Sequence, residues 1–78
     1  MRDRLERSIK ASYTTMEGRY QALQKSKYLE DLVFVAFYAG KVSATADIMR
    51  REYGDISGRE KKKTAWNLVR DAIAMMEG

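Results

Sequence analysis

The chain has 78 residues, with 15 Lys and Arg against 11 Asp and Glu, and it contains no His, Cys or Pro. A chain of this length has room for one small domain, and a domain of about 60 residues buries only about 60% of the surface of its unfolded chain. Disulfides and a thiolate or imidazole zinc site are excluded, because neither Cys nor His is present. We therefore expect stability to come from well-packed helices or from self-association.

The same composition argues against catalysis. Without imidazole or thiol groups, the chain cannot form a Ser-His-Asp or Cys-His nucleophile. Carboxylates, Lys and Tyr remain possible acids and bases, but a small domain has little room to enclose a pocket of roughly 300 Å³ or more beside its core. We expect a protein that is not an enzyme, with no metal, no cofactor and no small-molecule substrate.

Targeting and membrane segments are also not expected. Residues 2–7 are mostly charged and no apolar run follows them, which is unlike a signal peptide. The longest mostly apolar run, residues 32–40, is about half as long as a membrane-spanning helix. These features predict a cytoplasmic protein, or a nuclear one if its source is eukaryotic.

The first predicted helix covers residues 3–25. Its apolar side chains are spaced 4, 3, 4 and 3 residues apart, which is the heptad rhythm of a helix that packs along another helix. We call these residues the heptad seam: Ile9, Tyr13, Met16, Tyr20 and Leu23. Two interpretations stay open, a helix lying on its own domain and a dimerisation helix formed by residues 1–25. We favour a homodimer, because the core is small.

The middle of the chain predicts two short helices. The first covers residues 27–38, with Ser26 as N-cap and Gly40 as C-cap, and it is apolar on nearly all sides, as expected of a central core helix. The second covers residues 44–53, from a cap at Ser43 to a stop at Gly54. Arg50 lies in its last turn, where a cation suits the helix dipole.

The last predicted helix covers residues 58–76. Ser57 and Glu60 have the spacing of a capping box at its start. An apolar stripe that includes Ala65, Trp66 and Ile73 follows, and we expect Trp66 to lie in the core. The sequence thus predicts an all-α fold of about four helices, in which residues 27–77 form a three-helix core.

Charge is unevenly distributed along the chain. Residues 1–27 carry a net charge of +4, residues 28–57 a net −2 and residues 58–78 a net +2. The densest cationic cluster lies at the start of the last helix, where the helix dipole disfavours cations but suits a bound anion such as phosphate. Together with the end of the preceding helix, it gives the predicted nucleic-acid-binding residues: Arg50, Arg51, Arg59, Lys61, Lys62 and Lys63.

A helix, a short glycine-containing loop and a helix with a basic start loosely match a helix-turn-helix unit. The standard spacing does not match, because Arg50 occupies the position of a small residue and Glu60 that of an aliphatic one. The leading hypothesis is a small DNA-binding or transcription-regulating protein that contacts phosphates, with duplex DNA as partner, through the Gly54–Gly58 loop and the last helix. The alternative is a helical adaptor or inhibitor that docks onto a larger protein through the heptad seam.

Overall fold

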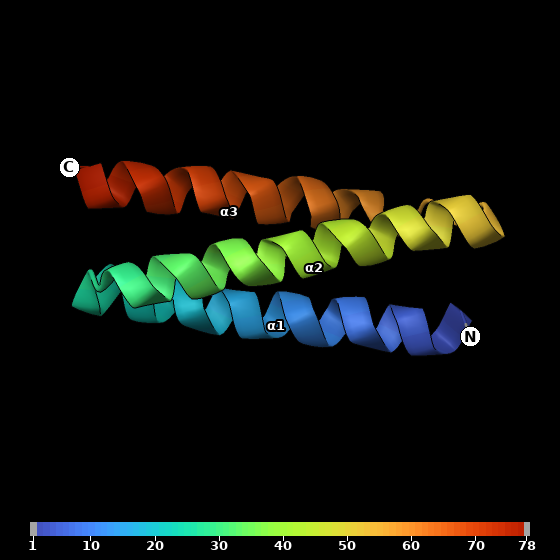
Figure 1. Cartoon of the computed structure of the whole chain (residues 1–78), viewed down its shortest axis with the longest axis horizontal. Coiled ribbons are helices and arrows are strands. Elements are labelled where there is room, and N and C mark those ends of the chain that lie inside the picture. Colours follow the sequence, from blue (N-terminus) through green and yellow to red (C-terminus); the bar gives the residue numbers. More distant parts are fainter. Residues whose placement is uncertain (1, 78) are drawn as a thin grey trace.

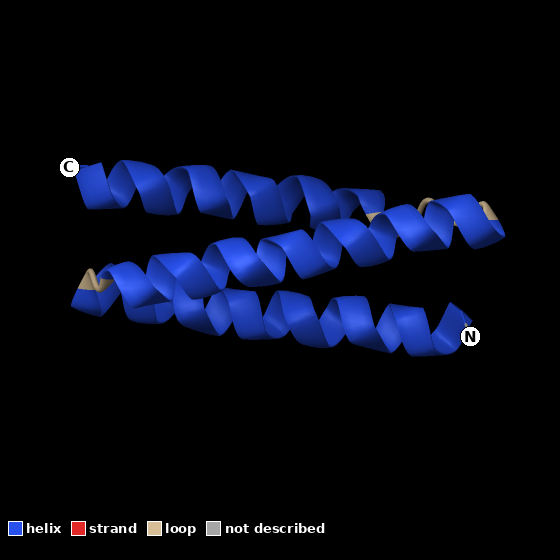
Figure 2. Cartoon of the chain, viewed as in Figure 1, coloured by secondary structure: helices blue, strands red, loops and turns tan. Residues whose placement is uncertain are grey.

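The structure is a computed structural model that describes residues 2–77. It contains three helices: α1 (Arg2–Ser26), α2 (Leu29–Tyr53) and α3 (Arg59–Glu77). Figure 1 shows them side by side with alternating direction, and α2 lies between the other two. Residues 2–77 hold no strand, and short loops join the helices (Figure 2), so the all-α prediction is confirmed over this range.

The middle of the chain is one helix, and the prediction of two short helices there was wrong. Gly40 and Ser43 lie inside α2. A helix-interior glycine costs about 1 kcal/mol relative to Ala, but Val35, Ala39, Val42 and other residues on both sides of Gly40 are buried. Burial of a side chain as large as Val contributes about 1.5–3 kcal/mol. Several such burials outweigh the cost of one glycine, so tertiary packing keeps the helix continuous through Gly40.

The predicted end of this helix is confirmed at Gly54. Gly54 has a φ of 63°, the left-handed conformation in which a residue without Cβ is favoured. Its N–H donates to the carbonyl of Arg50 at 2.9 Å, and the N–H of Asp55 donates to that of Met49 at 3.2 Å. These bonds satisfy carbonyls that the end of a helix leaves without partners.

The turn between α1 and α2 differs from the predicted cap. Ser26 is the last residue of α1, and Tyr28 holds the N-cap position of α2. The Ser26 hydroxyl accepts the Tyr28 N–H at 3.2 Å and donates to Asp31 Oδ2 at 2.9 Å. Asp31 is buried, and Arg19 Nη1 lies 3.7 Å from its Oδ1. Ser26 therefore closes the turn through Asp31 rather than by capping α2.

The loop between α2 and α3 is organised by Asp55 instead of the predicted Ser57–Glu60 capping box. Asp55 Oδ1 accepts the Ser57 N–H at 2.9 Å, and Oδ2 accepts Nε of Arg2 at 2.8 Å. The bonds from Ser57, and then the Arg2 guanidinium, lower the pKa of Asp55 to about 2. The carboxylate thus ties this loop to the start of α1.

The core lies along the line where the three helices meet. From α1 it takes Ile9, Met16 and Leu23, and from α2 it takes residues that recur every three or four positions. The fully buried residues of α3 are Ala65 and Ala72. The α2 residues are Val35, Ala39, Val42, Ala46 and Met49.

Candidate functional site

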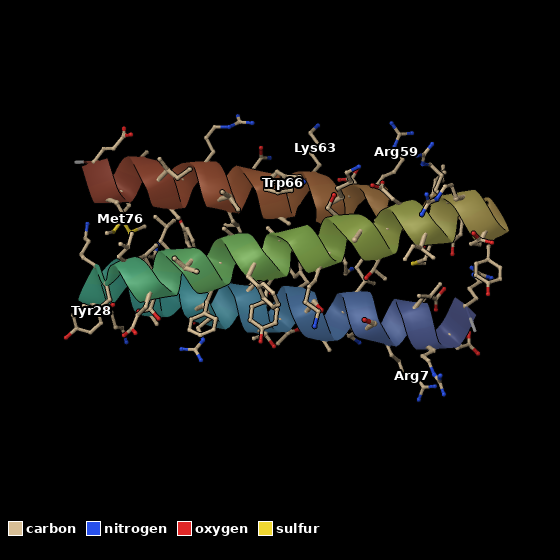
Figure 3. All side chains as sticks on the ribbon, in the orientation of Figure 1. Arg7, Tyr28, Arg59, Lys63, Trp66 and Met76 are labelled. Carbon is tan, nitrogen blue, oxygen red and sulfur yellow. The ribbon has the colours of Figure 1, made fainter. Side chains whose placement is uncertain are left out.

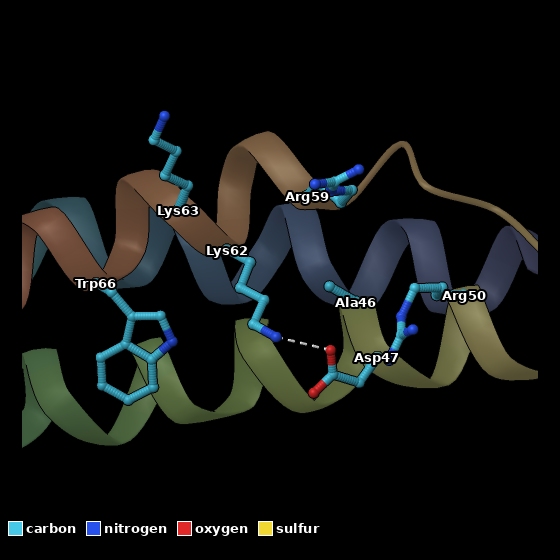
Figure 4. Close-up of a pocket in the computed structure, with 7 residues that line it drawn as sticks. All are labelled: Ala46, Asp47, Arg50, Arg59, Lys62, Lys63 and Trp66. Atoms are coloured by element: carbon cyan, nitrogen blue, oxygen red, sulfur yellow. Dashed lines mark hydrogen bonds and ion pairs between the residues drawn. The ribbon is translucent and has the colours of Figure 1, made fainter.

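A shallow groove lies between the C-terminal part of α2 and the first turns of α3. It has a volume of about 530 Å³ and is open to solvent. Figure 4 shows the residues that line it, most of which are charged. We call it the basic groove, formed by Ala46, Asp47, Arg50, Arg59, Lys62, Lys63 and Trp66.

Helix periodicity explains which of the predicted cations reach this groove. Arg50 follows Ala46 and Asp47 by about one turn of α2, so it shares their side of the helix. On α3, Lys62 and Lys63 follow Arg59 by three and four residues, so all three lie on one side of the helix. Because α2 and α3 lie side by side, these two rows converge, and four of the six predicted residues come together.

One of the four cations is already paired. Lys62 Nζ lies 2.8 Å from Asp47 Oδ1, and this hydrogen bond is the largest cause that lowers the pKa of Asp47. Both side chains are about 40% exposed, so solvent screening makes the pair only a weak contributor to stability. It still compensates the charge of Lys62 inside the groove.

The other three cations, Arg50, Arg59 and Lys63, carry the net positive charge of the groove. Among residues 2–77, no carboxylate lies within 4.0 Å of their charged groups. Figure 3 shows Arg59 and Lys63 extending away from the bundle. Three cations open to water therefore surround a single ion pair, an arrangement suited to a polyanion.

Trp66 lies in this groove, and the prediction that it belongs to the core was wrong. Trp66 is 42% exposed, and its indole extends across toward α2 in Figure 4. The inward position belongs to its neighbour Ala65, which is fully buried. Consecutive residues point about 100° apart on a helix, and the apolar stripe of the sequence contained both residues, so spacing alone did not select between them.

The remaining predicted cations lie elsewhere. Lys61 faces α1, where its Nζ is 6.0 Å from the centre of the Tyr13 ring, and it lines a smaller cleft with Glu6 and Lys10. Arg51 is exposed and is not among the residues that line the basic groove. Adjacent residues on one helix cannot all face one groove, which is why a run of basic residues divides between two surfaces.

The heptad seam packs inside the chain. Ile9, Met16 and Leu23 are buried, and Tyr13 and Tyr20 pack partly buried against the core. The heptad rhythm is therefore satisfied by α2 of the same chain. A partner, whether a second copy or the larger protein of the adaptor hypothesis, could reach the buried Ile9, Met16 and Leu23 only after α1 separates from α2.

The relation between α2 and α3 also differs from a helix-turn-helix unit. The two helices run beside each other in opposite directions along the bundle (Figure 1), whereas the helices of that motif cross steeply so that one can enter a groove of DNA. The start of α3 lies against the end of α2 and contributes one wall of the basic groove. Base-edge readout by an inserted helix is therefore not the geometry of this site.

One residue of this region was not among the predicted site residues. Asp47 pairs with Lys62 across the groove. Its partner is fifteen residues away, and only the packing of α2 on α3 brings them together. Among residues 2–77, no group of three or more carboxylates is placed to hold a metal ion.

By length and composition, α2 could cross a membrane. Its most apolar stretch has a mean hydropathy of 1.4, and 28% of that stretch is buried in the bundle. The core helix of a water-exposed protein passes the same test. The sequence expectation rested on the unbroken run of residues 32–40 and did not consider the average hydropathy over a longer stretch of the helix.

Comparison with known proteins adds no relative. The chain matches no family model, no curated protein and no solved structure.

Proposed function

We propose that the protein binds nucleic acid through the basic groove. The observation that carries this proposal is the grouping of Arg50, Arg59 and Lys63 around a half-exposed Trp66. Cations without nearby carboxylates attract the phosphate backbone, and each phosphate that they neutralise releases counterions. The aromatic ring supplies a face on which an unpaired base can stack. An ordinary solvated helix surface can also carry cations, but it does not require an exposed indole among them.

The geometry favours contacts to the backbone and to unpaired bases over readout of base edges. Arginine and lysine on an open groove can follow a phosphate backbone of any sequence. Stacking on Trp66 is available to any base that is not held in a duplex. The proposal therefore expects single strands to bind at least as tightly as duplex DNA of the same length.

The test is fluorescence anisotropy of labelled single-stranded and duplex DNA, titrated with the protein at several salt concentrations. The groove variant carries Arg50→Gln, Arg59→Gln and Lys63→Gln. We expect the slope of log K against log salt on duplex DNA to fall by up to about 3 if all three residues meet phosphates. Trp66→Ala should weaken single-strand binding by about 1–3 kcal/mol, the usual effect of one lost stacking contact.

A matched control separates the groove from net charge. Arg7, Lys25 and Arg70 are exposed cations that do not line the groove. Their replacement by Gln removes the same charge, and we expect a smaller change of slope. Equal losses in the two triple variants would show attraction by net charge alone, and an unchanged slope in the groove variant would refute the proposal.

A further inference from the structure

The side of α2 that faces away from the other helices is apolar and exposed. Leu29 is 65% exposed, Val33 59% and Phe37 58%, and Ala44 is exposed as well. The buried residues of α2, such as Val35 and Ala39, point in the opposite direction, because residues two apart differ by about 200° around a helix. We call this surface the outer face of α2, formed by Leu29, Val33, Phe37, Gly40 and Ala44.

Gly40 lies near the middle of this face and leaves room there for another chain. A Cβ on Gly40 would meet no atom within 4 Å, so nothing inside the chain requires glycine there. A glycine inside a helix nevertheless costs about 1 kcal/mol relative to Ala. A glycine at the centre of an apolar face allows a second helix to approach closely, which gives this position a purpose that the isolated chain lacks.

Two kinds of side-chain pair on or beside this face match a second copy of α2 running in the opposite direction, one by size and one by charge. Positions at equal height in such a pair have residue numbers that add to a constant. With a two-fold axis between Gly40 and Lys41, Phe37 meets Ala44 of the partner, a large side chain against a small one. At the ends, Glu30 meets Arg51 of the partner; both are exposed.

From these matches we propose that the protein forms a two-fold symmetric dimer through the outer face of α2, with the two α2 helices antiparallel. The interface then holds two Phe37–Ala44 contacts, a close approach of the two helices at Gly40 and two Glu30–Arg51 ion pairs. Antiparallel helix dipoles add to the attraction. Lys41 lies beside the axis, but its ammonium group lies 5.8 Å and 5.7 Å from the centres of its own Phe37 and Tyr38 rings, which directs it along the edge of the face.

The dimer has a consequence for the basic grooves. A two-fold axis perpendicular to the paired α2 helices leaves both copies of α3 on the same side of the dimer, so both grooves face one way. Arg50 lies nearly ten residues from the axis, so at about 1.5 Å per residue the two Arg50 residues, one in each groove, are about 30 Å apart along the helix direction. This consequence rests on the proposed function, whereas the dimer itself does not.

The test is sedimentation velocity over protein concentrations up to about 1 mM, a range that resolves Kd values from micromolar to millimolar. We expect a reversible monomer–dimer equilibrium in the wild-type protein. Phe37→Glu should raise Kd at least about tenfold, the effect of losing about 1.4 kcal/mol. The matched control is Ile56→Glu, which places the same charge on an equally exposed apolar residue in the loop, where exposure is 60%, and should leave Kd nearly unchanged.

Charge exchange tests the register of the two helices. Glu30→Arg alone and Arg51→Glu alone should each weaken the dimer, because each places like charges opposite one another. The double variant restores opposite charges in both pairs and should return Kd toward the wild-type value, with its net charge unchanged. Circular dichroism of each variant confirms that the monomer keeps its helices.

Three results would overturn the proposal. The first is a wild-type protein that stays monomeric at the highest concentration. The second is a dimer that Phe37→Glu and Ile56→Glu weaken equally, or that the double charge exchange fails to restore. The third is a monomer that binds vesicles of neutral phospholipid and loses this binding in Phe37→Glu, which would assign the outer face of α2 to a membrane surface. None of these measurements uses nucleic acid, so failure of the dimer and failure of the proposed function are distinguishable.

Discussion

Helices α1 and α3 both pack on α2, but they contact it with different side chains. α1 buries Met16 and Leu23 completely. The fully buried residues of α3 are two alanines, Ala65 and Ala72, while Leu68 and Val69 pack against the core only partly buried. The α1–α2 contact is therefore stabilised by apolar volume, and the α2–α3 contact by close approach and by polar contacts near the loop. The bundle has one strongly packed pair and a third helix held with less buried volume.

The largest expected effect concerns the α1–α2 contact. Met16→Ala should lower the free energy of unfolding by about 2–5 kcal/mol, the range for removing a fully buried Met side chain. Trp66→Ala, at a side chain that is 42% exposed, should lower it much less. Urea unfolding followed by circular dichroism measures both values. Equal losses would remove the distinction between the two helix contacts.

The next effect concerns the place where the start of α3 meets both other helices. A Cβ on Gly58 would lie 3.0 Å from Cβ of Ala46 and 3.1 Å from Cδ1 of Ile9. Gly58→Ala should therefore lower the free energy of unfolding by about 1–3 kcal/mol, as overpacking does. Hydrogen exchange should show the loss of protection first in α3 if this close approach holds that helix. A variant as stable as the wild type would show that the start of α3 can move outward freely.

A smaller effect of opposite sign is expected in the middle of α1. Gly18 lies inside the helix, and a Cβ there would meet no atom within 4 Å. Gly18→Ala should raise the free energy of unfolding by about 0.5–1 kcal/mol, because it removes backbone freedom from the unfolded chain without a clash. The same urea experiment measures the gain. A loss instead would contradict the open space that the structure shows around Gly18.

The smallest expected effect is the pH dependence that Asp55 gives to the loop before α3. Its pKa is about 2 in the folded protein against an ordinary value of 3.8, so the folded state favours the ionised form. The stabilisation is fully present above about pH 5 and is lost as the pH falls from the ordinary pKa toward about 2. Asp55→Asn lacks this contribution at every pH.

Urea unfolding of the wild type and of Asp55→Asn across this range checks the sign. The difference in unfolding free energy between the two proteins should be largest near neutral pH and should shrink as the pH approaches 2. A difference that is constant with pH would mean that the bonds from Ser57 and Arg2 do not favour the charged carboxylate.

Local patterns in the sequence were sufficient for the first helix and for the end of the second. The spacing of the heptad seam predicted the first helix of the chain within one residue at each end, and Gly54 was correctly predicted to end the second. Gly40 was misread because a glycine that ends a helix and a glycine inside a helix look alike in the sequence. Burial of residues on both sides decided between them, and burial depends on the whole fold.

The candidate site divides in the same way. The sequence located four of the groove cations, because residue spacing on a helix sets which side chains share a face. It did not separate Lys61 and Arg51 from them, since a run of basic residues holds no information about where the neighbouring helix lies. Trp66 was placed in the core for the same reason.

By itself the sequence determined the helical nature of residues 2–77, the absence of disulfide and zinc staples, and the concentration of cations near the last loop. Each follows from residue type and short-range spacing. Only the tertiary structure decided that α2 is continuous, that Asp47 meets Lys62, that Trp66 faces solvent and that the outer face of α2 is left open. These depend on which face of each helix its neighbours cover, and no local pattern fixes the positions of neighbours distant in sequence.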